Sequence, residues 1–249
     1  MIKIAKVSGR APGLALALAL VLALASHTAT AGEGPPVVVE LFTSQGCSSC
    51  PPADRFLGEL AKRDDVLALS VHVDYWDYIG WKDPFASPAN TKRQHRYARK
   101  MGLRYVYTPQ MIIQGADHAT GSDRPTVLAK IAEARKLDRL PVTIVRAEDG
   151  VRVTVPGAHT TDKAAVWLAV FDREHETAIQ RGENGGRTLK YHNVVHNIVR
   201  IGTWSGQPLD IPTGIAAMAG EGRDGCAVIV QSLSTGHILG AARVDLGDG

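Results

Sequence analysis

Two cysteines three positions apart, Cys47 and Cys50, are the residues of this chain best suited to chemistry. Such a C-x-x-C pair can exchange disulfides with a partner, form a fixed disulfide, or supply half of a metal site. The pair lies where an apolar run ends and a helical pattern begins. Unpaired N–H groups and the positive dipole end at a helix start lower the pKa of a cysteine there below about 8.5. We therefore interpret Cys47 as an exposed nucleophile and Cys50 as the resolving thiol.

The elements that must position this pair alternate between strands and helices. The β-branched, apolar run before Cys47 predicts a strand that is covered on both faces. Pro51 and Pro52 predict a helix start, because the N–H groups of a first turn have no intrahelical partner to lose. The pattern indicates an α/β fold with parallel pairing early in the chain. Its predicted elements are strands at residues 37–44, 66–75 and 108–115, and helices at residues 51–62, 89–101 and 124–137.

The pattern changes after Leu140. Four strand-like segments follow, with Asp-Gly and Thr-Gly turn signals between them and no convincing long helix. We place a boundary near residues 138–141 and predict a β-rich, sandwich-like part over residues 140–249. This part is either a separate module or an extension of the first sheet.

The first 31 residues have the three-part layout of a secretory leader. Basic residues precede an apolar block at residues 14–25, and small residues at positions 29–31 offer a cleavage site. The block is shorter than the roughly 20 residues that a membrane span needs. We predict a signal peptide at residues 1–31 and a periplasmic or secreted protein, without stable membrane association after cleavage. The alternative is a retained membrane anchor.

The charge balance gives no indication of nucleic-acid binding. The chain has 28 Lys and Arg against 25 Asp and Glu, and three of the basic residues lie in the predicted leader, which has no acids. The remainder therefore has 25 of each, and no basic stripe is left to predict nucleic-acid binding.

Cys226 is the odd third cysteine. It opens an apolar run, so we expect a buried, inert thiol.

Four spaced motifs carry a family resemblance. They are ELFTSQGCSSCPPAD, VDYWDYIGWKDPF, YTPQ and GENGGRTLKYHNVV. The order of these features resembles the thioredoxin-like fold: a strand is followed by C-x-x-C, a helix, a second strand and a later Thr-Pro. Together the motifs resemble a family of secreted bacterial proteins catalogued as domain of unknown function 1223. The resemblance implies a thioredoxin-like domain at residues 32–139, joined to β structure at residues 140–249.

The resemblance also implies roles for individual residues. Pro109 matches a cis-proline that faces the disulfide, which leaves the backbone of Thr108 free to pair with an extended substrate. Gly46 departs from the aromatic residue that thioredoxins usually have before the first cysteine, and Ser-Ser replaces the usual Gly-Pro between the two. We predict a thiol–disulfide oxidoreductase with Cys47, Cys50 and Pro109 as its catalytic residues. Its partners are exported proteins with thiols or disulfides, and it needs no bound cofactor.

An aromatic segment at residues 74–85 is the most unusual composition in the chain. We predict that Tyr75, Trp76 and Trp81 line a groove near the sulfurs and, with Thr108, bind the partner. The alternative is an aromatic lid that packs on the sheet. Asp74 or Asp77 would be a proton acceptor for Cys50 if either carboxylate lies within hydrogen-bond reach.

Two other functions remain open for the cysteine pair. The first is a binding protein in which a fixed Cys47–Cys50 disulfide ties the loop to the helix. The second is extracytoplasmic copper handling, because two thiolates and an imidazole suit Cu(I) and His72 lies on the second predicted strand.

Later segments have simpler interpretations. The glycines around Glu183 and Asn184 predict a tight loop that holds one of these side chains toward another surface. His192 and His196 are interpreted as solvated or hydrogen-bonded histidines rather than metal ligands, because on a strand they lie too far apart for one ion. The basic run at residues 92–100 is interpreted as the solvent-facing side of a helix.

Overall fold

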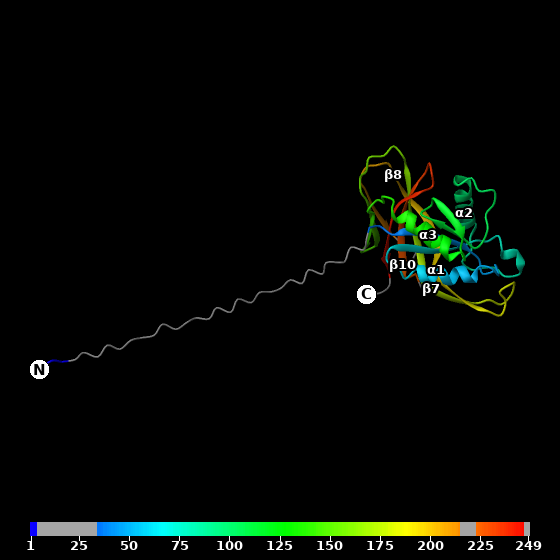
Figure 1. Ribbon diagram of the computed structural model, residues 1–249, viewed down its shortest axis with the longest axis horizontal. Helices are drawn as coiled ribbons and strands as arrows, with labels where there is room; N and C mark the ends of the chain where they lie inside the picture. Colours follow the sequence, from blue (N-terminus) through cyan, green and yellow to red (C-terminus); the bar gives the residue numbers. More distant parts are fainter. Residues whose placement is uncertain (4–33, 215–222, 247–249) are drawn as a thin grey trace. The chain divides into compact units, whose positions relative to one another are not determined.

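The computed structural model describes residues 1–3, 34–214 and 223–246 (Figure 1). The chain divides into two units, residues 1–31 and residues 32–249, and every element below belongs to the second. Apart from its first three residues, the predicted leader lies outside the described residues. The elements are β1 (Val37–Thr43), α1 (Pro51–Leu60), β2 (Val66–His72), a 3₁₀ turn (Asp77–Ile79), α2 (Pro88–Lys100), β3 (Gln110–Ile113), β4 (Asp117–Thr120), α3 (Arg124–Arg135), β5 (Thr143–Ala147), β6 (Gly150–Val155), β7 (Ala164–Ala178), β8 (Thr188–Trp204), β9 (Leu209–Gly214), β10 (Gly225–Ser232) and β11 (Ile238–Asp245).

Strands β1 and β2 are the parallel pair that supports the cysteines. Every residue of both strands is buried, as their continuous apolar runs predict. Their register pairs Val37 with Val66 at one end and Thr43 with His72 at the other. The carboxyl ends of both strands therefore lie together, and the C-x-x-C loop and the start of α1 follow β1 at that edge.

One mixed sheet joins the two halves of the sequence. Its eight strands have the order β11-β10-β7-β8-β2-β1-β3-β4. Strand β8 runs parallel to β2, at the pair Ser70 and Val194, while β7, β10 and β11 continue the sheet with antiparallel pairing. The β-rich half thus extends the first sheet, which answers the question that the sequence left open. The fold is α/β, and most of its elements are strands, as predicted.

Three apolar layers hold these elements together. Helices α1 and α3 pack on one face of β1, β2 and β3. On the opposite face, residues of β1 and β2 share a core with α2, β7 and β10. A second sheet of three strands, β5-β6-β9, covers the other face of β7 and β10. Cys226 lies in this third core, which confirms its predicted burial, and burial raises the pKa of its thiol to about 12.

The basic run of α2 faces solvent as predicted, except at Arg93. Its exposed members are Lys92, Arg96, Arg99 and Lys100. Arg93, Gln94 and Tyr97 are buried, and Arg93 forms a two-pronged ion pair with Glu40 of β1 at 2.6 and 2.9 Å. The reason lies in β1, which is covered on both faces and carries an acid at its centre. A buried carboxylate needs a cation and hydrogen-bond donors, and α2 supplies both through Arg93 and the hydroxyl of Tyr97.

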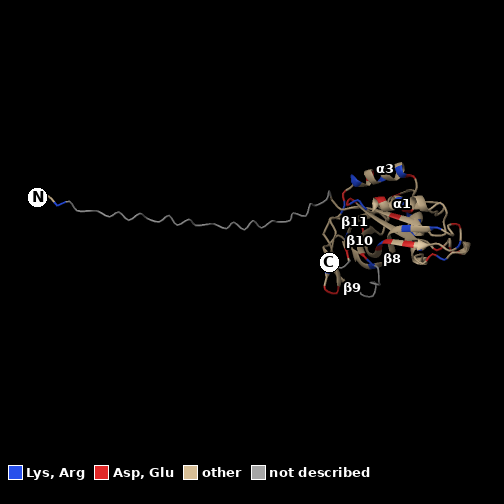
Figure 2. Cartoon of the chain, turned by 90° about the horizontal axis from the view of Figure 1, so that it is seen from below, with Lys and Arg blue, Asp and Glu red and all other residues tan. Residues whose placement is uncertain are grey.

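Charged residues of both signs are distributed over the described elements. Figure 2 shows Lys and Arg interspersed with Asp and Glu along the elements. Among the described residues, none of the helices has the length and apolar composition to cross a membrane.

Candidate functional site

A disulfide joins Cys47 to Cys50 at the start of α1, with 5.5 Å between their Cα atoms. Cys50 is the N-cap residue of α1, and its carbonyl oxygen accepts hydrogen bonds from the backbone N–H groups of Ala53 and Asp54 at 2.8 and 3.1 Å. Pro51 and Pro52 occupy the first two helical positions, as predicted. The pair is therefore held at the positive end of a helix dipole.

The structure corrects the expectation that Cys47 is exposed. Cys47 is 1% exposed and Cys50 is fully buried, while Ser48 and Ser49 between them face solvent. Residues of the aromatic segment pack against the neighbouring Gly46. A Cβ atom at Gly46 would lie 3.2 Å from Ile79 Cδ1 and 3.3 Å from Trp76 Cβ. A larger side chain before Cys47 would therefore crowd Trp76 and Ile79.

The predicted glycine-rich loop holds the cysteine loop from a second side. Asn184 is buried, and its side-chain amide donates to the carbonyl oxygens of Gln45 and Cys47 at 2.9 and 3.0 Å. Glu183 accepts a 3.2 Å hydrogen bond from the backbone N–H of Ser48. These contacts confirm that the loop presses a side chain against another surface, and they identify Asn184 as that side chain.

The aromatic segment packs over the same loop. Trp76 Nε1 donates to the Thr108 hydroxyl at 2.7 Å, Trp81 Nε1 donates to the Gln45 side chain at 2.8 Å, and the Tyr75 hydroxyl is 3.1 Å from the side-chain oxygen of Gln94. Trp76 therefore contacts both Gly46 and Thr108. Trp76 and Trp81 therefore pack on residues that flank the disulfide rather than line an established groove beside it.

Residues Thr108 and Pro109 lie next to the first turn of α1. The peptide bond between them is cis, as the resemblance implies. Pro109 is buried, and a Cβ atom at Gly121 would lie 2.9 Å from that of Ala53 and 3.3 Å from that of Pro109. The absence of a side chain at Gly121 thus allows the turn after β4 to pack between Pro109 and α1.

A buried acid lies one helical turn after Cys50. Asp54 is 4% exposed, and its Oδ1 accepts a 2.8 Å hydrogen bond from the Thr43 hydroxyl. Its Oδ2 has no hydrogen-bond partner among the described residues. Burial raises the pKa of Asp54 to about 7, against the lowering effects of nearby His72 and of the Thr43 hydrogen bond.

His72 links this acid to the cysteine loop. Its Nδ1 lies 2.6 Å from Asp83 Oδ2, which also accepts the backbone N–H of Gln45 at 2.8 Å. Burial lowers the pKa of His72, but Asp83 and Asp54 outweigh it and the net shift is upward. Tyr191 packs against the imidazole with 5.0 Å between ring centroids. His72 Nε2 and the Tyr191 hydroxyl are, like Asp54 Oδ2, buried without a hydrogen-bond partner in the described part of the chain.

The two acids predicted as proton acceptors for Cys50 form hydrogen bonds with other residues. Asp74 accepts a 2.5 Å hydrogen bond from the Thr91 hydroxyl, and Asp77 accepts one from the backbone N–H of Asp83, so both are engaged away from Cys50. Asp54 had a signal that could have identified it. It lies three positions before the buried Leu57, on the apolar side of α1, where an acid is unusual.

The histidines do not gather into a metal site. His192 lies 3.5 Å from Glu174, whereas His196 lies 2.7 Å from Asp172. His72 is engaged by Asp83. Across the described residues there is no group of three or more His, Cys, Asp or Glu side chains that could hold a metal ion.

The fold and the site define an α/β protein with a mixed sheet and a C-x-x-C disulfide at a helix start. The chain belongs to the protein family of unknown function DUF1223, whose model matches residues 38–231. This match confirms the family resemblance seen in the four motifs. No curated protein matches the chain significantly.

Two solved structures are similar to this one. The crystal structure of an Agrobacterium tumefaciens protein is 35% identical, with a TM-score of 0.77, and the match covers 87% of this chain and 96% of that chain. HBP35 of Porphyromonas gingivalis is 13% identical, with a TM-score of 0.59 over 86% of this chain and 76% of that chain. The second likeness is one of fold alone.

Proposed function

We propose that this is an exported thiol–disulfide exchange protein that acts on other exported proteins through Cys47 and Cys50. The leader pattern at residues 1–31 supports export. The order of the elements supports a thioredoxin-like unit. Strand β1, helix α1 and the parallel strand β2 are followed by a cis-proline, the antiparallel strands β3 and β4, and helix α3.

The observation that carries the proposal is Asp54. A fixed disulfide has no need of a proton acceptor, and a buried carboxyl oxygen without a hydrogen-bond partner is destabilising. Such a group, with a pKa of about 7 and one helical turn from Cys50, suits an acid–base role in exchange. Asp54 would take the proton of the Cys50 thiol when that sulfur attacks.

The exchange has two steps. The Cys47 thiolate attacks a partner disulfide, a mixed disulfide forms, and the first partner sulfur leaves as a thiolate. Cys50 then transfers its proton to Asp54 and attacks the Cys47 sulfur, and the second partner sulfur leaves. The dithiol of this protein is oxidised by two electrons and the partner disulfide is reduced. The same steps in reverse oxidise a partner dithiol.

Access to Cys47 requires local opening. In the oxidised form Cys47 is 1% exposed, and Trp76 lies beside the cysteine loop, against Gly46 and hydrogen-bonded to Thr108. Displacement of Trp76 would expose Cys47 and the backbone of Thr108 together. The cover then acts as a gate that keeps small thiols from the disulfide until a protein partner docks.

A trapping experiment tests the proposal. The variant Cys50→Ser leaves Cys47 without a resolving thiol, so its reduced form should accumulate mixed disulfides with exported proteins. The control is Cys47→Ser, which keeps Cys50 and should form no such adducts. The absence of adducts with Cys50→Ser, together with a reduction potential below about −300 mV for the native pair, would contradict exchange.

A fixed disulfide in a binding protein is the second candidate. Its support is the burial of both cysteines and the two hydrogen bonds that Asn184 makes to the cysteine loop. The same reduction potential separates the two functions, since a structural disulfide resists reduction by the glutathione pool.

A further inference from the structure

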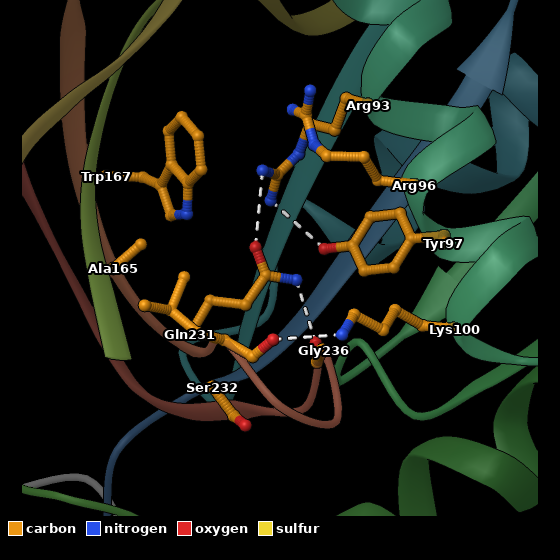
Figure 3. A pocket seen from close by; sticks show the side chains of 10 residues that line it. Arg93, Arg96, Tyr97, Lys100, Ala165, Trp167, Gln231, Ser232 and Gly236 are labelled. Atoms are coloured by element: carbon orange, nitrogen blue, oxygen red, sulfur yellow. Dashed lines mark hydrogen bonds between the residues drawn. The ribbon is translucent and has the colours of Figure 1, made fainter. Parts of the chain in front are cut away.

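A cavity of about 110 Å³ lies between α2, β7 and the turn after β10 (Figure 3). It shares no lining residue with the Cys47–Cys50 site. Its walls combine aromatic and aliphatic side chains with three cations. The residues on which the argument rests are Arg93, Arg96, Lys100, Trp167, Gln231 and Leu233.

The cations of this cavity are only partly neutralised. Arg93 is paired with Glu40, and it also donates to the Gln231 side chain at 3.4 Å. Lys100 donates to two backbone carbonyl oxygens, at 2.7 and 2.9 Å, which satisfies its hydrogen bonds but not its charge. Arg96 lies 5.5 Å from the centre of the Trp167 ring, and no carboxylate among the described residues is within ion-pair distance of it.

One acid lies near the rim. Asp162 accepts a hydrogen bond from the hydroxyl of Ser232, which is a lining residue. With Glu40 assigned to Arg93, the cavity and its rim still carry one positive charge in excess. An anion is therefore favoured over a neutral or cationic ligand.

The indole of Trp167 adds a hydrogen-bond donor without an acceptor. Its Nε1 is buried and has no hydrogen-bond partner in the described part of the chain. An indole N–H can only donate, and a buried one normally has an acceptor. Figure 3 shows the Trp167 ring and the guanidinium of Arg93 on facing sides of the cavity. Because this N–H is closed to water, the part of Trp167 that a ligand in the cavity would meet is its ring.

We infer that this cavity binds a small organic anion with one carboxylate on a flat, apolar body. The carboxylate accepts from Arg96, since a guanidinium matches carboxylate geometry. The apolar body packs between the Trp167 ring and Leu233. Inorganic phosphate fits less well, because these apolar walls would face its oxygens without donors.

Indole N–H signals in nuclear magnetic resonance spectra of the full chain test this inference, with sodium benzoate as the probe. The chain has four tryptophans, and Trp167→Phe identifies the signal of Trp167. Benzoate should shift that signal saturably and leave the other three unchanged. In Arg96→Gln the dissociation constant should rise at least tenfold. The control Arg99→Gln removes an exposed charge from the same helix outside the cavity and should leave the affinity unchanged.

Several outcomes would overturn the inference. They are the absence of a saturable shift, an equal affinity in Arg96→Gln, and binding of benzamide or inorganic phosphate as tight as that of benzoate. If Arg96→Gln does not fold, Lys100→Met gives the same comparison. Benzoate binding should persist in Cys47→Ser, so this result is independent of the proposed exchange activity.

Discussion

The burial of Asp54 predicts how the free energy of unfolding changes with pH. The folded pKa is about 7, against 3.8 for the ordinary carboxyl, so the native state holds a proton that the unfolded state has released. A raised folded pKa makes ionisation unfavourable for the fold. The penalty is absent below the unfolded pKa, grows as the pH rises between the two values, and is complete above the folded one. About three pKa units at about 1.36 kcal/mol each correspond to roughly 4 kcal/mol.

The variant Asp54→Asn mimics the protonated acid at every pH. Its free energy of unfolding, relative to that of the native protein, should therefore rise by up to about 4 kcal/mol between about pH 4 and about pH 8. The assay is urea denaturation of both oxidised proteins at several pH values, with the slope m compared for each.

An exposed acid gives the matched control for this measurement. Asp149→Asn makes the same chemical change at the turn between β5 and β6 and should not alter the pH dependence. If the curves for Asp54→Asn and the native protein run parallel over the whole range, Asp54 does not titrate with a raised pKa. The reasoning about its role in exchange would then be refuted.

The remaining predictions concern the cover over the disulfide and the buried ion pair. Trp76→Ala should accelerate reduction by dithiothreitol about fivefold, since it removes a hydrogen bond worth about 1 kcal/mol. Tyr105→Ala, at an exposed position outside this segment, should not. Equal rates for the two variants would contradict the gate. Glu40→Ala should lower the free energy of unfolding by about 3–5 kcal/mol in urea, because it leaves Arg93 charged and buried. Glu59→Ala breaks an exposed pair and should leave the free energy of unfolding nearly unchanged. A similar loss in both variants would argue against a desolvated pair.

Local patterns predicted the elements around the cysteines well. The strand expected at residues 37–44 is β1, and the helix expected at residues 51–62 is α1, which ends at Leu60. Both predictions rest on side-chain periodicity and on Pro in a first turn, which act within about ten residues of chain. The short strand β4 was missed, because its four residues carry no such pattern.

The cover over the disulfide could not be predicted. Asn184 reaches a loop 139 positions away, and Trp76 fills the space beside Gly46 from another element. The burial of Arg93 likewise depends on Glu40, which lies 53 positions earlier. In each case the partner is chosen by how whole elements pack, and the spacing of residues along the chain does not encode that packing.

The sequence by itself determined the family, the α/β pattern of its first half and the position of Cys47 and Cys50 at a helix start, because each depends on residues close together in the chain. Tertiary structure alone decided that β8 extends the sheet beside β2, that Cys47 is covered, and that Asp54 is buried next to His72. The physical reason is desolvation. Whether a thiol or a carboxyl group is charged depends on how much water the distant parts of the chain exclude from it.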